Sequence, residues 1–469
     1  MSEAQSLFAV LRQSADADCV TALERIVREA PDRRLNRMNV LDFAKREDLD
    51  EERSITTFLQ AAQIGLFDMS WNVLCPSCNG VLDANATLKS VRSQEYYCAF
   101  CNLNNEPTLD DMVEVSFTVS PRARRIAAHK PDELPIWEYY RQIFWGTGID
   151  LPDDDIDKAL QRLTLESVEL PAGDKALLSL QLPEGFIIVL EPVTHAAQFI
   201  NVKGEPTQER QNLSLVYNNL RAPAGVMDLR PGPVRLSLEN RTAERVLPVV
   251  WLVNEDFVAV TGKRRPYLTA KRLLSNQTFR DIYRTDTLDV DQRLKITSLT
   301  FLFTDLKGST ELYERVGDLV AFDLVREHFR TLNEIVAAEG GAVVKTIGDA
   351  VMATFLTPDH ALAAALRMRD AMRRLNDTHG REDLLLKIGI HEGPCLAVSM
   401  NERQDYFGQT VNIASRVQGL AQTRSILATA PVVDYPRSAS LLGNNGRKPL
   451  AQSHPLRGVA AEVAVYEIP

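Results

Sequence analysis

The chain has 469 residues, more than one hydrophobic core usually holds, so we expect several domains. Hydrophobic residues make up 45% and charged residues 25% of the chain, proportions that exclude collagen, coiled-coil and wholly disordered proteins. The net charge of -10 argues against a nucleic-acid partner, because neutralising phosphates needs a surplus of Lys and Arg. The acidic N-terminus and the lack of an apolar run of about 18 residues predict no membrane partner and a cytoplasmic location.

Residues 1–72 are predicted to form a helical, winged-helix-like unit, because apolar residues recur at helical spacing. The last of these helices is expected to span SITTFLQAAQIGLFDM, residues 54–69. A helix that reads DNA is normally basic. Residues 31–70, however, hold eight acidic residues against six basic ones, namely Arg33, Arg34, Arg37, Lys45, Arg46 and Arg53. We therefore interpret this unit as one that packs or contacts another protein.

Four of the six cysteines form two Cys-x-x-Cys pairs, Cys75 with Cys78 and Cys98 with Cys101, separated by 19 residues. Each pair can direct two sulfurs at one tetrahedral ion, which predicts a zinc ribbon over 73–120. Four free thiols and two disulfides are the alternatives. Because four protein ligands leave no open coordination position, the Zn²⁺ would be structural.

Residues 121–262 are predicted to form a β-rich, sandwich-like regulatory domain. Short runs of branched residues are separated there by Gly, Pro and Asn at strand-like intervals. The aromatic residues around Trp137 and Trp145 are expected to pack on a neighbouring part of the chain, and residues 263–295, polar and of mixed charge, to form a connector.

Residues 296–469 have the predicted element order of a ferredoxin-like βαββαβ core. A buried strand precedes a helix over 310–338, a hairpin, a second helix over 359–376 and another strand. A second hairpin is expected at Gly393-Pro394, followed by a helix from Gln409. The fold class expected for the whole chain is therefore α+β, with several domains.

Two aspartates are candidates for a metal site in this last region. Asp305 follows the first strand, and Asp349 lies in the first hairpin turn, so the topology brings both carboxylates to one sheet edge. Two converging carboxylates are costly unless a cation joins them, and Mg²⁺ with substrate phosphates is the usual partner. The loop of Leu306, Lys307, Gly308, Ser309 and Thr310 opens a helix whose free N–H groups can hold phosphate.

Four segments in this region, FTDLKGST, KTIGDAVMATF, IGIHEGP and DYFGQTVNIASR, resemble the successive motifs of class III nucleotidyl cyclases. The resemblance covers about 296–469. It implies that Asp305, Asp349 and the backbone of Leu306 hold two Mg²⁺ or Mn²⁺ ions in each active site. The preceding half resembles an uncharacterised zinc-containing region found ahead of some bacterial cyclase domains, which brings no known activity.

The resemblance also implies how the substrate is bound. Lys345 and Asp405 occupy the base-reading positions, and a donor beside an acceptor fits adenine, whereas guanine presents the reverse pattern. Asn412 would orient the ribose and Arg416 would stabilise charge on the phosphates. Arg457 is the candidate for a further basic contact with the triphosphate, for which the family commonly uses Lys.

The leading hypothesis from the sequence is an adenylate cyclase that acts on ATP as a homodimer, under control of the N-terminal region and an unknown ligand or protein. A guanylate cyclase is one alternative. Another is a regulatory binding protein whose cyclase domain only dimerises, although no catalytic Asp or Arg is missing. A diguanylate cyclase would need a Gly-Gly-Asp/Glu-Glu-Phe hairpin where KTIGDAV stands.

Overall fold

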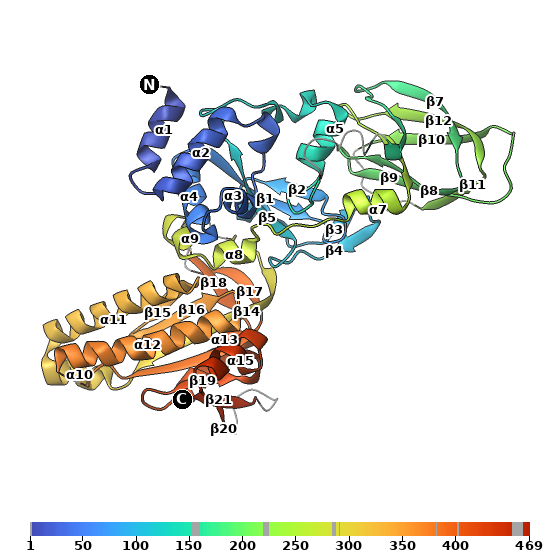
Figure 1. Ribbon diagram of the computed structural model, residues 1–469. Helices are drawn as coiled ribbons and strands as arrows, with labels where there is room; N and C mark the ends of the chain where they lie inside the picture. Colours follow the sequence, from blue (N-terminus) through green and yellow to red (C-terminus); the bar gives the residue numbers. More distant parts are fainter. Residues whose placement is uncertain are drawn as a thin grey trace. The chain divides into compact units, whose positions relative to one another are not determined.

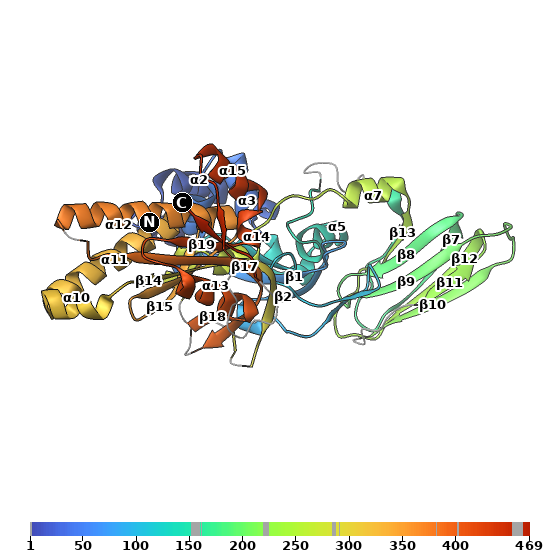
Figure 2. The ribbon, with the colours of Figure 1, turned by 90° about the horizontal axis from the view of Figure 1, so that it is seen from below.

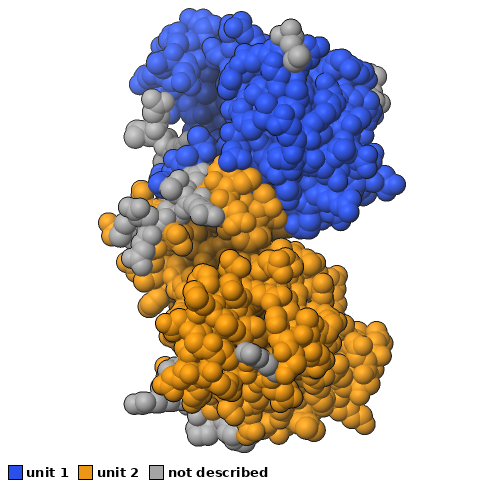
Figure 3. All heavy atoms as spheres, turned by 90° about the vertical axis from the view of Figure 1, so that its left-hand side faces the viewer, with its two compact units in different colours: residues 1–107, 111–268 blue, residues 108–110, 269–469 orange. Residues whose placement is uncertain are grey.

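A computed structural model describes residues 2–151, 160, 162–218, 225–283, 288, 289, 291–380, 382–400, 403–452 and 463–469. The chain divides into two compact units (Figure 3). Unit 1 comprises residues 1–107 and 111–268, and unit 2 comprises residues 108–110 and 269–469. Among the described helices, none is both long and apolar enough to cross a bilayer.

Unit 1 begins with four helices that pack beside a small antiparallel sheet (Figure 1). The helices are α1 (Glu3–Leu11), α2 (Ala17–Glu29), α3 (Val40–Arg46) and α4 (Glu51–Gln63), and a 3-10 turn, η1 (Asp32–Arg34), follows α2. The sheet has the order β2-β1-β5, with β1 (Phe67–Leu74), β2 (Val81–Asn85) and β5 (Val113–Val119). Phe58 of α4 is fully buried and lies 5.1 to 5.4 Å from the rings of Phe43, Phe67 and Phe117, which joins helices and sheet.

The helical unit expected to reach residue 72 ends earlier than predicted. Helix α4 stops at Gln63, and β1 already begins at Phe67. Gly65, with a φ of +78°, turns the chain between them, a conformation that glycine adopts without strain. Strand β1 pairs with β5 from Phe67 to Val73, so one sheet extends across the expected boundary at residue 72.

The segment between β2 and β5 holds the second cysteine pair. It contains a 3-10 turn, η2 (Leu88–Ser90), and a short hairpin of β3 (Tyr96–Cys98) and β4 (Leu103–Asn105). Three further short segments lead out of this region, η3 (Ala127–His129), η4 (Pro131–Glu133) and α5 (Ile136–Tyr139), and a π-helical turn, η5 (Tyr140–Phe144), follows. Tyr140, Phe144 and Trp145 are buried in one cluster with Trp251, so the aromatic residues do pack on a neighbouring part of the chain.

The rest of unit 1 consists of two sheets that share one core, as in a sandwich (Figure 2). One sheet has the order β10-β12-β7, and the other has the order β11-β9-β8-β13-β6. The strands are β6 (Thr164–Ser167), β7 (Lys175–Leu182), β8 (Gly185–Glu191), β9 (Ala196–Val202), β10 (Gln211–Tyr217), β11 (Val226–Leu229), β12 (Gly232–Asn240) and β13 (Val249–Val253), and α7 (Glu255–Thr261) follows them. Alternate residues such as Val234, Leu236 and Leu238 face the core, the period-2 burial expected of a strand.

Unit 2 is built on a sheet of order β15-β16-β14-β17-β19-β21-β20, with β18 paired to β17. Its strands are β14 (Leu294–Leu306), β15 (Ala342–Ile347), β16 (Ala350–Phe355), β17 (Leu386–Met400), β18 (Arg403–Phe407), β19 (Ile426–Thr429), β20 (Leu450–Gln452) and β21 (Val465–Ile468). Its helices are α8 (Ala270–Leu274), α9 (Gln277–Ile282), α10 (Ser309–Val316), α11 (Asp318–Ala338), α12 (Pro358–His379), α13 (Gln409–Leu420), α14 (Ala430–Val433) and α15 (Pro436–Asn444). The first four strands and two long helices have the predicted βαββαβ order, with β14 and β17 adjacent.

Helices cover both faces of this sheet. Helices α11 and α12 share a core with Ile426 and Ala428 of β19, whereas α13 packs on Leu427, the residue between them. Because successive strand residues point to opposite faces, α13 lies on the face away from α11 and α12.

Two predicted boundaries in unit 2 are wrong. The helix expected over 310–338 is divided into α10 and α11 at Gly317, whose φ is +80°. The hairpin expected at Gly393-Pro394 is not a turn, because both residues lie within β17. There the pairing with β14 shifts register between Ile296 and Leu299, so the ladder is interrupted where Pro394 has no N–H to donate.

Gly389 of β17 allows α13 to approach the sheet closely. A Cβ at this position would lie 2.2 Å from the backbone N of Gln418, so Gly389→Ala should force α13 away and destabilise unit 2 by about 1 to 3 kcal/mol. Gly419→Ala is the matched control, since a Cβ there meets no atom within 4 Å and alanine favours a helix. Thermal unfolding of both variants tests this, and equal stability would show that the approach does not constrain the helix.

Candidate active site

Strand β14 carries the first candidate metal ligand where the buried strand ends. Asp305 is half-buried, and its carboxylate lies 3.9 Å from Nζ of Lys387, its neighbour on β17. Burial raises the pKa of Asp305, and the negative charge of Asp349 raises it further. The second effect places the two carboxylates within electrostatic reach of each other.

Asp349 lies in the tight turn between β15 and β16, beside Gly348 with a φ of +63°. The turn is held next to β14, because the backbone N–H of Val351 donates to Oγ1 of Thr304 at 3.1 Å. Oδ2 of Asp349 is buried and has no hydrogen-bond partner among the described residues. A buried carboxylate oxygen without a described partner, on a turn that adjoins the strand carrying a second carboxylate, is a donor set that fits a divalent cation.

A buried histidine on α11 adjoins this carboxylate site. Burial lowers the pKa of His328 to about 4, against the opposing influence of Asp349. The imidazole is therefore neutral at pH 7, and its Nδ1 lies 3.4 Å from Sδ of Met372. Nothing in the sequence pattern singles out His328, since a lone histidine on the buried face of a helix is usually a core residue.

The loop after Asp305 connects β14 to helix α10. Leu306 is buried, the backbone N–H of Lys307 donates to the carbonyl of Leu385 at 2.9 Å, and Gly308 has a φ of +71°. Helix α10 begins at Ser309. The side chains of Ser309 and Thr310 are outside the described part of the structure, as is the whole of Arg457.

Lys345 and Asp405 are in direct contact. Nζ of Lys345, on β15, donates to Oδ2 of Asp405, on β18, at 2.5 Å. The side chain of Asp405 is only 8% exposed, and its other oxygen accepts the N–H of Tyr406 at 2.9 Å. A cationic donor and an anionic acceptor therefore lie side by side.

Helix α9 contacts the residues that flank this pair, which the sequence did not indicate. Nη2 of Arg280 donates to the carbonyl oxygens of Gln404 at 2.7 Å and Val344 at 3.3 Å. Oε1 of Gln277 accepts the N–H of Val343 at 2.8 Å. The segment interpreted as a connector thus holds the two backbones that present Lys345 and Asp405.

Asn412 and Arg416 are four residues apart on α13 and share one face of it. Asn412 is exposed and Arg416 is half-buried, while Ile413, Ala414 and Val417 are buried. Both candidate polar side chains are therefore kept out of the core.

The four cysteines of unit 1 come together. Their Sγ atoms lie within 4.8 Å of one another, with Cys75 and Cys101 separated by 3.8 Å and Cys78 and Cys98 by 3.6 Å. These separations are far too long for disulfides. A tetrahedral ion with bonds of about 2.3 Å would place its sulfurs about 3.8 Å apart, so the cluster fits a metal ion of zinc's size.

Comparison with known proteins gives the family. Residues 1–281 match a family of unknown function, DUF5939. The chain belongs to this family. Residues 292–448 match the adenylate and guanylate cyclase catalytic domain, so this DUF5939 protein also carries a cyclase catalytic domain.

The relatives that this chain resembles include two adenylate cyclases. The adenylate cyclase of Anabaena cylindrica is 30% identical over 188 residues, which are 36% of this chain and 36% of that protein. Adenylate cyclase 2 of Rhizobium meliloti is 33% identical over 147 residues, which are 28% of this chain and 40% of that protein. The chain thus spans less than half the length of these relatives. The crystal structure of the adenylyl cyclase CyaB from P. aeruginosa is 24% identical, with a TM-score of 0.33, over 38% of this chain and 96% of that one.

Proposed function

We propose that the chain is an adenylate cyclase that converts ATP to 3′,5′-cyclic AMP and pyrophosphate. The contact between Lys345 and Asp405 carries the proposal. Lysine can only donate and an ionised aspartate can only accept, which matches the N1 acceptor and the 6-amino donor of adenine. Guanine offers the reverse pattern and would leave both charged groups without partners, a mismatch that buried polar sites discriminate strongly.

Cyclisation of ATP forms one bond at the α-phosphorus and breaks another there. The negatively charged triphosphate must be held in place during this exchange. The ribose 3′-hydroxyl gives up its proton to solvent and its oxygen bonds to the α-phosphorus, while the bond from that phosphorus to the oxygen bridging to the β-phosphorus breaks and pyrophosphate leaves. Asp305, Asp349 and the backbone of Leu306 would hold two divalent cations, Mg²⁺ or Mn²⁺, which when bound would acidify the 3′-hydroxyl and neutralise charge on the leaving pyrophosphate. The exposed amide of Asn412 orients the ribose, and the guanidinium of Arg416 stabilises charge that develops on the phosphates.

We infer that two copies of the chain share each active site. Along β17, Asp305 lies opposite Lys387 at the start of the strand, whereas Asp405 lies opposite Val398, eleven residues further on. A head-to-tail homodimer would bring the carboxylates of one copy to the base-reading pair of the other. Two equivalent sites result, because each chain contains every one of these residues.

We also propose that the four-cysteine cluster holds a structural Zn²⁺ and that unit 1 regulates the cyclase domain. Three of the four cysteines are buried, so a substrate would have little access to the bound ion. A closed set of four protein ligands stabilises a fold and leaves no open position for catalysis.

Mixing two inactive variants tests both the activity and the shared site. Asp305→Ala removes a metal ligand and Lys345→Ala removes a base contact, so each should form almost no cyclic AMP from ATP. In a mixture, hybrid dimers keep one intact site of two, and activity should return. Subunit exchange is verified separately with labelled chains, and a mixture that exchanges but remains inactive contradicts the shared site.

The choice of base can be tested by reversing the hydrogen-bonding pattern. Lys345→Glu combined with Asp405→Ser should raise the ratio of kcat/KM for GTP over that for ATP by at least about tenfold. Each single substitution should mainly lower activity, since Lys345→Glu leaves the buried Asp405 beside a second negative charge and Asp405→Ser leaves Lys345 without its acceptor. If the ratio does not rise in a double variant that still dimerises, these residues do not read the base.

Metal analysis of protein purified without chelator should find about one zinc ion per chain. Cys75→Ser should lose this ion and destabilise residues 73–105, because binding energy in such sites is largely folding energy. Cys19→Ser is the control, since Cys19 is a buried cysteine of the same unit outside the cluster. Protein that contains no zinc, or that keeps it in Cys75→Ser, contradicts the assignment.

A further inference from the structure

Arg280 of α9 bonds to the two strands that carry the proposed base-reading residues, and the proposed mechanism assigns it no role. Its Nη2 donates to the carbonyl of Gln404 at 2.7 Å and to the carbonyl of Val344 at 3.3 Å. Gln404 directly precedes Asp405 on β18. Val344 likewise precedes Lys345 on β15. One guanidinium group is therefore bonded to both backbones, in each case one residue before a proposed adenine contact.

The sheet by itself fixes these two strands relative to each other only indirectly. Among the described strands, no ladder joins β15 to β18. Strand β15 lies at the edge of the sheet and pairs with β16, whereas β18 pairs with β17. The route from one strand to the other along the ladders runs through β16, β14 and β17. A contact that bridges β15 and β18 directly therefore adds a constraint that the sheet does not supply.

A β-bulge in β15 leaves a carbonyl that Arg280 bonds. The register between β15 and β16 shifts between Val343 and Lys345, so Val344 is the extra residue and has no Cα partner on β16. Bulges are common beside active sites, where they redirect a side chain. The carbonyl of Val344 accepts from Arg280, and the N–H of Val343 donates to Oε1 of Gln277 at 2.8 Å. Side chains of α9 thus hold the irregular part of β15 immediately before Lys345.

The guanidinium of Arg280 is itself fixed by buried neighbours. Its Nη1 donates to the carbonyl of Leu274, at the end of α8, at 3.4 Å, and its Cζ lies 6.0 Å from the ring centre of Tyr406. Tyr406 is only 3% exposed, and its hydroxyl donates to the same carbonyl at 3.3 Å. The N–H of Tyr406 donates to Oδ1 of Asp405 at 2.9 Å. A buried side chain therefore links Arg280 to Asp405 by a second route.

Selecting a base leaves little tolerance in the spacing of donor and acceptor. Nζ of Lys345 and a carboxylate oxygen of Asp405 would have to match N1 and the 6-amino group of adenine at the same time. Functional groups must be held within about 0.5 Å of the productive position, and an error of about 1 Å can cost about a hundredfold in rate. The side chain of Lys345 is flexible and 41% exposed, so placing Nζ reliably requires a fixed backbone.

We propose that Arg280 is a positioning residue of the proposed ATP site, which fixes the backbones of β15 and β18 and thereby the spacing of Lys345 and Asp405. Arg280 acts on base selectivity through this pair and makes no contact with the base. The inference rests on the proposed function, since it concerns the residues that are proposed there to read adenine. All three residues belong to unit 2, so the network is complete within one copy of the chain.

Binding of two nucleotide analogues tests this without turnover. In α,β-methylene ATP and α,β-methylene GTP, a carbon replaces the oxygen between the α- and β-phosphorus atoms, so the bond that cyclisation breaks is absent. Isothermal titration of the full chain with Mg²⁺ should show that the wild type binds the ATP analogue about tenfold or more tightly than the GTP analogue. Arg280→Ala should weaken binding of the ATP analogue about tenfold and reduce the preference for adenine at least about threefold.

A double substitution separates positioning from a loss of folded protein. Asp405→Ser already breaks the base-reading pair. Adding Arg280→Ala to it should change the preference for adenine by less than about twofold, because residues that act through one contact are not additive. Loss of folded protein would instead lower the number of binding sites in the titration and leave the preference unchanged.

Two further variants keep the test valid if Arg280→Ala folds poorly. Gln277→Ala removes the contact with the N–H of Val343 and should reduce the preference for adenine by a smaller factor, about twofold. Arg373→Ala is the matched control, since Arg373 is 57% exposed on α12 of the same unit and lies 3.9 Å from Asp370, an exposed pair of little energetic weight. This control should bind both analogues as the wild type does, and thermal unfolding verifies the fold of every variant.

The outcomes distinguish a failure of this inference from a failure of the proposed function. If the wild type and Arg280→Ala prefer the adenine analogue equally, Arg280 has no positioning role, and the adenylate cyclase proposal is unaffected. An effect of Arg280→Ala that is undiminished beside Asp405→Ser also overturns the role. If the wild type binds both analogues equally, or neither, adenine is not selected at this site and both proposals are wrong. If Arg280→Ala alone loses the preference, the positioning role stands even where no cyclic AMP is formed.

Discussion

The pairing of β14 with β16 and β17 is the constraint on which the cyclase domain depends. Strand β14 is buried from Leu299 to Thr304, so its register is fixed by which side chains face each layer of helices. A slip of one residue would turn every side chain to the opposite face. The same register places Asp305 at the end of the strand, beside the turn that carries Asp349. The position of the candidate metal ligands is therefore a consequence of core packing.

The two halves of the proposed active site differ in how their charges are satisfied within one chain. Lys345 and Asp405 neutralise each other, and Arg280 holds the backbone on both sides of them. Asp305 and Asp349 instead repel each other, and one oxygen of Asp349 lacks a partner among the described residues. A cation and a triphosphate would satisfy the charges of Asp305 and Asp349. Adenine would have to separate the ion pair of Lys345 and Asp405 or share its hydrogen bonds. Substrate binding at the proposed site would then change the contacts of β15 and β18, whose backbones accept from or donate to side chains of α9.

The sequence predicted those features that depend on neighbouring residues along the chain. The order of elements in unit 2 and the convergence of the four cysteines followed from periodicity and spacing. The end of α4 could not be predicted in this way. Residues 54–69 are rich in apolar residues on both sides of Gly65, and only the pairing with β5 makes Phe67 part of a strand. The turn predicted at Pro394 was wrong because this residue lies within β17. Whether a strand can hold a proline there depends on the shift of register in its pairing with β14, which the sequence of β17 does not show. The contacts of α9 involve residues more than 60 positions away, which periodicity cannot reveal.

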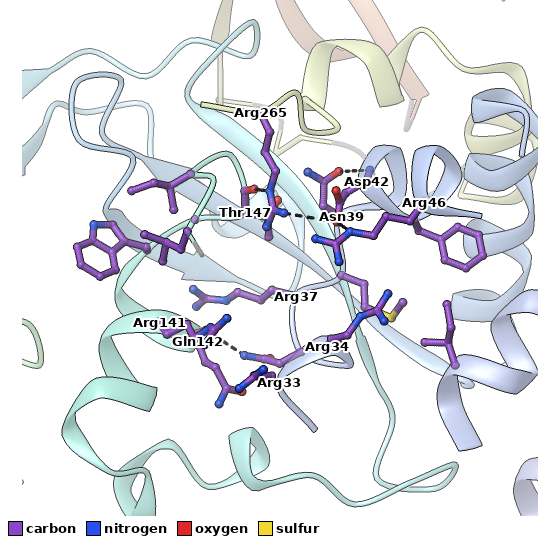
Figure 4. A pocket seen from close by; sticks show the side chains of 18 residues that line it. Arg33, Arg34, Arg37, Asn39, Asp42, Arg46, Arg141, Gln142, Thr147 and Arg265 are labelled. Atoms are coloured by element: carbon purple, nitrogen blue, oxygen red, sulfur yellow. Dashed lines mark hydrogen bonds and ion pairs between the residues drawn. The ribbon is translucent and has the colours of Figure 1, made fainter. Parts of the chain in front are cut away.

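The net charge of a segment is a poor guide to how its charged side chains are arranged after folding. Residues 31–70 carry more acidic than basic side chains, yet four of their six basic residues line one hollow, and Arg141 and Arg265 join them from distant segments. The acidic residues lie mostly elsewhere, and solvent and ions screen exposed charges beyond about 10 Å. A net charge of -10 therefore does not prevent folding from gathering arginines of distant segments at one place in unit 1 (Figure 4).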